Sequence, residues 1–207
     1  IGLRNLDLAL GLTDRALMDF SDVALDRCPL EAAVVAHPSI PNLYLLTAPV
    51  RMRGPAVTEE DFRRMLRKIR QQFDFCLLDA PAGLGRGFQL ATCAADRCVV
   101  VTTADASSLR DAQHTVMELD RFPSGALHLV VNRVRKKLLR QLHATIDDAI
   151  DKAGLPLLGV VPEDDALPLC MNRGVPILLA DGQSAATAYR NIAKRLQGER
   201  VPLLRIR

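Results

Sequence analysis

The chain has 207 residues, 49% of them hydrophobic and 25% charged, which fits one folded domain with a substantial core and excludes a disordered chain. Its net charge of +3 is too small to dictate a partner, and no apolar run approaches the ~20 residues that cross a bilayer. The five cysteines form neither a Cys-x-x-Cys pair nor a zinc spacing, so we interpret them as reduced thiols of a cytosolic protein.

The sequence opens on Ile1 rather than Met and runs directly into a polar segment. We therefore expect that the chain lacks its N-terminus, with a processed or deliberately trimmed protein as the alternative. Arg4 and Asn5 lie in this segment, where their side chains could reach a phosphate or a partner subunit. Asp7 could cap the helix that follows.

Short apolar runs recur along the chain, and most are continuous rather than alternating, as in strands that are covered on both faces. They occupy residues 43–46, 75–78, 98–101, 127–131 and 157–161. Helix-length segments lie between or after them, near residues 107–121, 138–153 and 184–197. This alternation predicts an α/β fold, a doubly wound and mostly parallel sheet with helices on both faces.

The clearest helix begins after Thr58, a good N-cap residue that is followed by three acidic residues. Its apolar side chains share one helical stripe, namely Phe62, Met65, Leu66, Ile69 and Phe73. Its basic residues predict a solvated polar face: Arg63, Arg64, Arg67, Lys68 and Arg70.

Asp79 follows the apolar run at 75–78 and begins the turn Asp79-Ala80-Pro81-Ala82-Gly83. A carboxylate at the end of a buried strand can hold a Mg²⁺-bound water beside a phosphate. Gly83 permits unusual backbone angles or a close approach to that phosphate, and Pro81 stiffens the turn. A simple turn cap is the alternative interpretation of Asp79.

Two further candidates stand at predicted strand ends, where open α/β sheets bind their ligands. Asn132 follows the run at 127–131 and could present its amide to a purine edge. Pro162 and Glu163 follow the run at 157–161, where the ring could flank a base. Ordinary turn and cap roles remain open for these residues. A basic stretch follows Asn132 and could contact anionic lipid or nucleic acid: Arg133, Arg135, Lys136, Lys137 and Arg140.

Residues 1–7, 79–83 and 130–135, in this order along the chain, resemble the deviant Walker (ParA/MinD) family of P-loop ATPases. The resemblance is greatest to the MinD branch of that family. Residues 172–176, 188–193 and 198–203 also look like MinD-type sequences, so the resemblance spans essentially the whole chain. The opening heptapeptide is the most specific piece, because it separates MinD-type proteins from their ParA-type relatives.

The resemblance implies an ATPase that dimerises with ATP, holds peripherally to the inner face of a bacterial plasma membrane from the cytoplasm, and helps place the division septum. The implied cofactors are ATP and Mg²⁺. The implied partners are a second copy, a division inhibitor of the MinC type, an activator of the MinE type or another polar regulator, and an anionic membrane surface. Nucleic acid is not expected.

The resemblance also implies residue roles. Asp79 is then the Walker B-type carboxylate that serves Mg²⁺ through a water. Asn132, Pro162 and Glu163 would frame the adenine, and Gly83 would lie near the γ-phosphate. The implied switch and dimer-interface residues are Arg4, Asn5, Ala80, Pro81 and Ala82.

The family's phosphate loop, which carries two lysines, is expected before Ile1 and does not occur in this chain. Residues 1–207 are therefore expected to be a single MinD-like ATPase domain that lacks its N-terminal strand and phosphate loop, and that is inactive alone. The tail from Val201 mixes apolar and basic residues but is too short for a firm amphipathic anchor. The alternatives are a ParA-like or flagellar-number ATPase, or a non-hydrolysing scaffold of the same fold.

Overall fold

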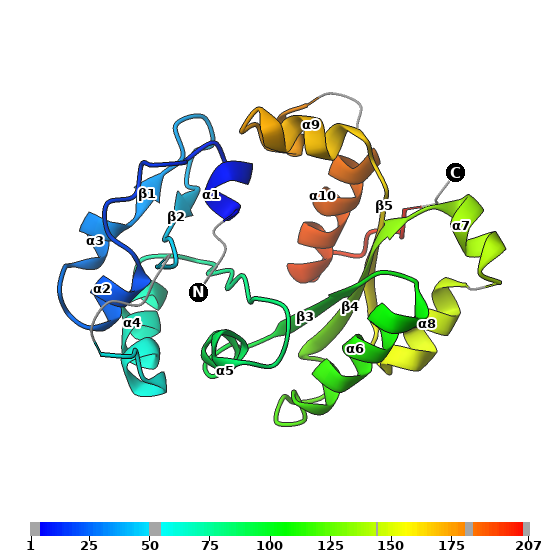
Figure 1. The fold of residues 1–207 in the computed structure, drawn as a ribbon, viewed down its shortest axis with the longest axis horizontal. Helices are drawn as coiled ribbons and strands as arrows, with labels where there is room; N and C mark the ends of the chain where they lie inside the picture. The colour runs from blue at the N-terminus through cyan, green and yellow to red at the C-terminus, as the bar shows by residue number, and fades with distance from the viewer. Residues whose placement is uncertain (1–4, 50–54, 144, 181–183, 205–207) are drawn as a thin grey trace. The chain divides into compact units, whose positions relative to one another are not determined.

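The computed structural model describes residues 5–49, 55–143, 145–180 and 184–204. The chain divides into two compact units, which can be followed by colour in Figure 1. The first unit contains residues 1–95 and 170–176, and the second contains residues 96–169 and 177–207. The single domain over residues 1–207 stays a prediction.

The second unit is built on a parallel three-stranded sheet. Its strands are β3 (Cys98–Thr102), β4 (Leu127–Val134) and β5 (Leu157–Pro162), in the order β3-β4-β5. The middle of β5 is buried on both faces, as the continuous apolar run predicts. Three of the five predicted strands are therefore confirmed, and so is the α/β fold class.

Helices cover both faces of this sheet (Figure 1). The helices α6 (Ala106–Met117) and α8 (Ile146–Ala153) pack against each other and against β3 and β4, while α10 (Ser184–Leu196) packs on β5. The approach of α10 requires a glycine, because a Cβ added to Gly159 would overlap Ile192. Arg195 of α10 donates a hydrogen bond to the carbonyl of Val201 at 2.9 Å and so holds the start of the tail, which is not helical over residues 201–204.

The first unit contains mostly short helices. The helices are α1 (Leu6–Ala9), α2 (Phe20–Ala24), α3 (Leu30–Ala33), α4 (Glu59–Arg70) and α5 (Arg86–Thr92). An apolar cluster lies among α2, α3, α4 and α5. The cluster includes Val23, Leu30, Val57, Phe62, Met65 and Leu90. The helix α9 (Ala166–Asn172) contains the boundary between the units at residue 170, and the 3₁₀ turn η1 (Ile177–Leu179) belongs to the second unit.

The helix predicted after Thr58 is confirmed as α4. The Thr58 hydroxyl accepts a hydrogen bond from the Asp61 N–H at 3.1 Å, and the Asp61 carboxylate accepts one from the Thr58 N–H at 3.0 Å. This reciprocal capping box satisfies two backbone donors at the helix start. The apolar stripe points into the core, since Phe62, Met65 and Ile69 are buried.

One further predicted strand is confirmed only in part, and another was wrong. In the 43–46 run only Tyr44 and Leu45 form a strand, β2, which pairs antiparallel with β1 (Val35–Ala36). The run at 75–78 belongs to no strand, and Phe75 and Leu77 are 70% and 87% exposed. Apolar sequence predicts burial of side chains, whereas a strand also needs a neighbour for its backbone, and no described segment pairs with this run.

The helix predicted over 138–153 is two helices, α7 (Lys136–Gln141) and α8. His143 has a φ of +48°, which leaves the right-handed helical region. Thr145 then caps α8 through a second capping box with Asp148. None of the helices among the described residues has the length and apolar character needed to span a membrane.

Candidate functional site

The end of β4 contains a bulge at the residue predicted to contact a base. Val131 pairs with Val160 and Val134 pairs with Pro162, so two residues of β4 stand opposite one residue of β5. Those two residues are Asn132 and Arg133, and Arg133 has a φ of +53°. Bulges of this kind redirect a side chain where a strand reaches a binding edge.

The Asn132 side chain is held by its neighbour in this bulge. Its Oδ1 accepts a hydrogen bond from the Arg133 backbone N–H at 2.9 Å. An amide oxygen has a second lone pair, and the amide nitrogen has two hydrogens, so a donor and an acceptor remain for a ligand. The amide can therefore still pair with the edge of a purine.

Glu163 lies next to the bulge and is held by two arginines. Its Oε1 accepts a hydrogen bond from Arg133 Nη2 at 3.2 Å and lies 3.2 Å from Arg135 Nη2. Its backbone N–H donates to the Val134 carbonyl at 3.1 Å. The hydrogen bond from Arg133, followed by that from Arg135, lowers the pKa of Glu163 below its ordinary value.

The structure thus brings Asn132, Pro162 and Glu163 together at the carboxyl edge of β4 and β5. Sequence reasoning did not find that Arg133 and Arg135 hold Glu163, because it treated them as part of a basic stretch. Their two-residue spacing at a strand end was the available signal, since such residues share a face. The nucleotide-binding role of these residues stays a prediction.

A second polar cluster, which sequence reasoning also missed, stands at the carboxyl end of β3. The Asp105 carboxylate accepts hydrogen bonds from the hydroxyls of Thr103, Ser107 and Ser108 and from the Ser108 N–H. These bonds, led by the one from Ser107, hold the pKa of Asp105 far below its ordinary value. An Asp before Ala-Ser-Ser is an N-cap signal, and Asp105 caps α6 in this way.

Asp164 anchors two helices beside Glu163. Its Oδ1 accepts from the Ala166 N–H and its Oδ2 from the Ala185 N–H, each at 3.1 Å. These bonds fix the start of α9 and the first turn of α10 to the end of β5. Helix caps or ion pairs therefore lie at the carboxyl ends of all three strands: Asp105 after β3, Arg133 in β4, and Glu163 and Asp164 after β5.

The turn that begins at Asp79 belongs to the first unit. Its residues from Asp79 through Gly83 are exposed, and Gly83 has a φ of +86°, as a glycine permits. A Cβ added to Gly87 would stand 2.5 Å from Pro81 Cγ, so the glycine lets α5 approach the turn. Arg86 fastens α5 by donating to the Val57 carbonyl at 2.7 Å.

Asp79 supplies the carboxylate of this turn. Among the described residues, no group of three or more His, Cys, Asp or Glu side chains could hold a metal ion. Mg²⁺ keeps several of its waters and uses few protein carboxylates, so one exposed carboxylate fits a role in holding a metal-bound water. It does not fit a metal site made of protein ligands alone.

The remaining predicted site residues lie at the start of the chain. Asn5 is the N-cap residue of α1, is exposed, and makes no capping hydrogen bond through its side chain. Arg4 lies outside the described residues.

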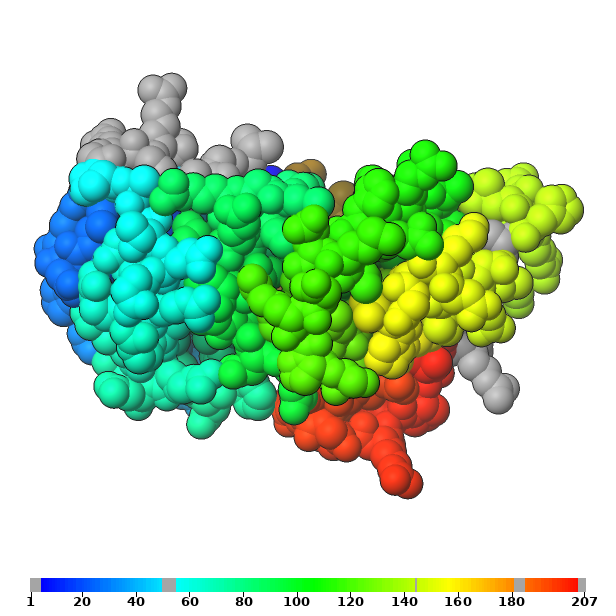
Figure 2. Space-filling model, turned by 90° about the horizontal axis from the view of Figure 1, so that it is seen from below, coloured from blue at the N-terminus to red at the C-terminus, as the bar shows by residue number. Residues whose placement is uncertain are grey.

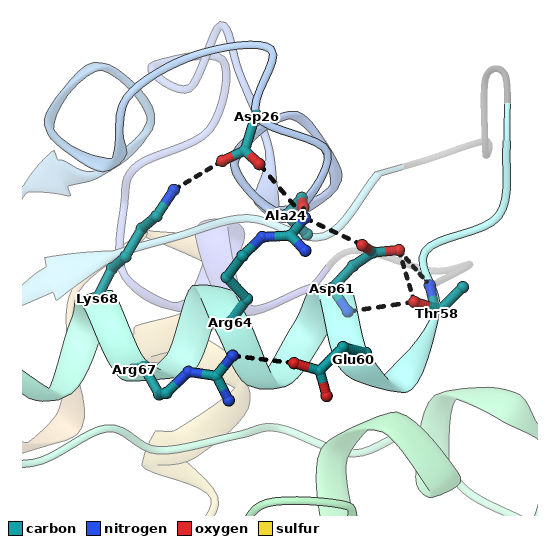
Figure 3. A network of polar contacts seen from close by, with 8 residues as sticks. All are labelled: Ala24, Asp26, Thr58, Glu60, Asp61, Arg64, Arg67 and Lys68. Atoms are coloured by element: carbon teal, nitrogen blue, oxygen red, sulfur yellow. Dashed lines mark hydrogen bonds and ion pairs between the residues drawn. The ribbon is translucent and has the colours of Figure 1, made fainter.

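The basic face of α4 is neutralised by acidic neighbours, as Figure 3 shows for most of its residues. Arg67 pairs with Glu60 at 2.9 Å, and Lys68 pairs with Asp26 at 2.7 Å. Arg64 reaches the Asp61 carboxylate at 3.0 Å and also donates to the Ala24 carbonyl. This face is a set of exposed ion pairs that fastens the end of α2 to α4, in agreement with a solvated helix face.

A cavity of about 500 Å³ lies at the other end of β4 and β5, where both strands begin. His128, Leu157 and Arg195 are among its lining residues. Burial, followed by the charges of Arg97 and Arg195, lowers the pKa of His128. Because ligands of open α/β sheets bind at the carboxyl ends of the strands, this cavity is not the expected site.

The chain matches the family model described as cellulose biosynthesis protein BcsQ over residues 48–195. It is 37% identical over 206 residues to the septum site-determining protein MinD of Bacillus subtilis, covering 98% of this chain and 77% of that protein.

Two solved structures share the fold. The MinC:MinD cell division protein complex of Aquifex aeolicus matches with a TM-score of 0.89 and 33% identity, over 99% of this chain and 83% of that one. MinD of Pyrococcus horikoshii, complexed with Mg-ADP, matches with a TM-score of 0.78 and 24% identity, over 94% of this chain and 79% of that one.

Proposed function

Because the chain belongs to the MinD family of septum site-determining proteins, we propose that it is an ATP-driven switch that helps to place the division septum. The observation that carries this proposal is the match to MinD along nearly the whole chain, with 37% identity to the Bacillus subtilis protein. The proposed site segments at 79–83 and 130–135 both lie within the 98% of this chain that the match covers.

We assign the nucleotide to the carboxyl edge of β4 and β5. The Asn132 amide would recognise the purine edge, and Pro162 and Glu163 would border the base. The Arg133 and Arg135 side chains keep Glu163 in place. Because the Asn132 side chain is fixed by the bulge, little side-chain freedom is lost when a base binds.

The Asp79 turn would serve the phosphate end of the nucleotide. When bound, Mg²⁺ would neutralise charge on the phosphate oxygens. The Asp79 carboxylate would accept a hydrogen bond from a water and so orient it. Gly83 has a positive φ, and a glycine would let the backbone of this turn change its path near the γ-phosphate. Turns that contact a γ-phosphate can convert its loss into a change of the dimer interface.

The wider role follows from the family. We propose that two copies associate with ATP at the inner face of a bacterial plasma membrane and recruit a division inhibitor of the MinC type. The Aquifex aeolicus structure is a MinC:MinD complex, and this chain matches it over 99% of its length. An activator of the MinE type, or another polar regulator, would stimulate hydrolysis and release the dimer.

The match to the BcsQ family model over residues 48–195 favours one second candidate, a related protein that serves cellulose biosynthesis. The two candidates share a fold and differ in partner. Loss of the gene would misplace septa under the first and reduce cellulose under the second.

The test uses the protein expressed from its full coding sequence together with the MinC-type inhibitor of the same organism. Size-exclusion chromatography with a non-hydrolysable ATP analogue should give a dimer that elutes with the inhibitor. With ADP the two proteins should elute apart. Association that is equal with both nucleotides, or absent with both, would overturn the proposed switch.

A further inference from the structure

The helix α7 follows directly from β4 and carries little of the fold. Residues 136–141 form it, and none of them is buried. It lies beyond the carboxyl end of β4 at the margin of its unit (Figure 1), and Figure 2 shows this yellow-green part of the chain standing out at the edge. A helix with no buried face gains little from packing within its own unit.

Apolar side chains are exposed on this helix. Leu138 and Leu142 are 44% and 47% exposed, and the Leu142 N–H donates to the Leu138 carbonyl at 2.9 Å. Residues four apart on a helix share one face, so these two side chains form an apolar pair turned to solvent. Exposing a leucine pair beside cations is typical of a helix that lies on a membrane surface.

The charged residues of the segment that carries this pair are all basic. No Asp or Glu occurs between Arg133 and His143. Arg133 and Arg135 are paired with Glu163, which leaves Lys136, Lys137 and Arg140. The side chains of these three make no hydrogen bond or ion pair with another described residue, in contrast to the paired cations of α4.

We propose that the α7 surface, defined as Lys136, Lys137, Leu138, Arg140 and Leu142, contacts the headgroups of anionic phospholipids. Its cations would pair with lipid phosphates, and its two leucines would enter the boundary between the headgroups and the acyl chains. A nucleic acid is the weaker match, because the segment 133–143 has no Phe, Tyr or Trp to stack on bases and exposes aliphatic side chains instead. The inference rests on the membrane association of the proposed function and adds a contact outside the tail.

The first experiment measures co-flotation of the full-length protein with vesicles of phosphatidylglycerol and phosphatidylcholine in equal parts. The triple variant Lys136→Gln, Lys137→Gln, Arg140→Gln should bind about 100-fold more weakly, since each cation near an anionic surface contributes about fivefold. The matched control is Arg63→Gln, Arg67→Gln, Lys68→Gln on α4. It removes the same charge from ion-paired cations and should bind within about twofold of wild type.

A second measurement reports on the leucines directly. The chain contains no Trp, so Leu142→Trp places a single indole on the α7 surface. Its emission should shift to shorter wavelength with anionic vesicles and stay unchanged with pure phosphatidylcholine vesicles. A Met18→Trp control, at another exposed apolar residue, should not respond to either.

Three results would overturn the proposal: no binding of the wild type to anionic vesicles, equal vesicle binding by the α7 triple variant, or a Leu142→Trp spectrum that does not respond. Loss of binding to a short DNA duplex in the α7 variant, with vesicle binding retained, would assign the surface to nucleic acid and also overturn it. ATP-dependent association with the MinC-type partner is measured in parallel and should be unchanged in the α7 variant. Failure of that assay in the wild type would count against the proposed function instead.

Discussion

Glu163, the residue after β5, accepts a hydrogen bond at 3.2 Å from the side chain of Arg133, which lies in the bulge of β4. The partners differ in exposure, since the Glu163 side chain is 22% exposed and that of Arg133 is 66% exposed. The carboxylate is therefore the fixed member of the pair, and the arginine folds back over it. This contact joins the residue that follows Asn132 to the segment proposed to border the base.

Replacing Glu163 by Gln should weaken nucleotide binding severalfold and leave the maximal rate of hydrolysis nearly unchanged. The amide keeps the shape but loses the charge that holds both arginines, so the base-bordering segment is less fixed. Steady-state kinetics on the full-length protein measure the effect as a raised KM with an unaltered kcat. A fall in kcat with KM unchanged would contradict a positioning role.

Asp105→Ala should lower the free energy of unfolding by about 1–2 kcal/mol, because the variant loses the N-cap of α6. The pKa of Asp105 is lowered in the folded protein, so its stabilisation is present at neutral pH and is lost as pH falls below about 4. Urea denaturation at pH 7 and at pH 3 should therefore show a difference between wild type and variant that shrinks at low pH. A difference that grows at low pH would contradict the sign of the shift.

The backbones of Gly11 and Gly174 touch, and a Cβ on Gly11 would overlap the carbonyl oxygen of Gly174. Both residues have positive φ, at +65° and +60°. Gly11→Ala should lower the free energy of unfolding by about 2–4 kcal/mol, from the strained φ together with the overlap.

The matched control is Gly125→Ala. Gly125 also has a positive φ, of +87°, but a Cβ there meets nothing within 4 Å. Its cost should be about 1 kcal/mol, from the backbone angle alone. Equal losses at both positions would show that the contact with Gly174 contributes nothing.

Gly159→Ala should destabilise the protein by about 1–3 kcal/mol, because the new methyl group overlaps Ile192 of α10. Shortening Ile192 to Val makes room, so the double variant should recover part of that loss. A double-mutant cycle in urea gives the coupling between the two positions. Strict additivity of the two changes would contradict the close packing of α10 on β5.

Sequence reasoning succeeded where a local chemical signal determines the structure. The Thr58 cap, its acidic first turn and the apolar stripe predicted α4, and the continuous apolar runs predicted β3, β4 and β5. These features depend on residues close in sequence or on runs of apolar side chains. The runs of β4 and β5 are buried on both faces, whereas Val99 and Val101 of β3 are exposed.

It failed where the outcome depends on a distant partner. The run at 75–78 has the composition of a strand, yet a strand needs backbone hydrogen bonds that its own sequence does not specify. The break between α7 and α8 is different, because it carried a local signal that sequence reasoning missed: Thr145 and Asp148 form a capping box, as Thr58 and Asp61 do. The pairing of Glu163 with two arginines required the register of β4 against β5, which only the fold reveals.

The rate of Mg²⁺-dependent ATP hydrolysis by the full-length protein, with and without Asp79, tests the central claim most directly. The Asp79→Ala variant should lose at least about 100-fold in turnover, because its carboxylate is the proposed anchor of the metal-bound water. Asp74→Ala is the matched control, since it removes an exposed carboxylate five residues earlier in the same segment and should hydrolyse ATP as the wild type does. Wild-type turnover in Asp79→Ala, or no hydrolysis by the wild type, would contradict the proposed ATP-driven switch.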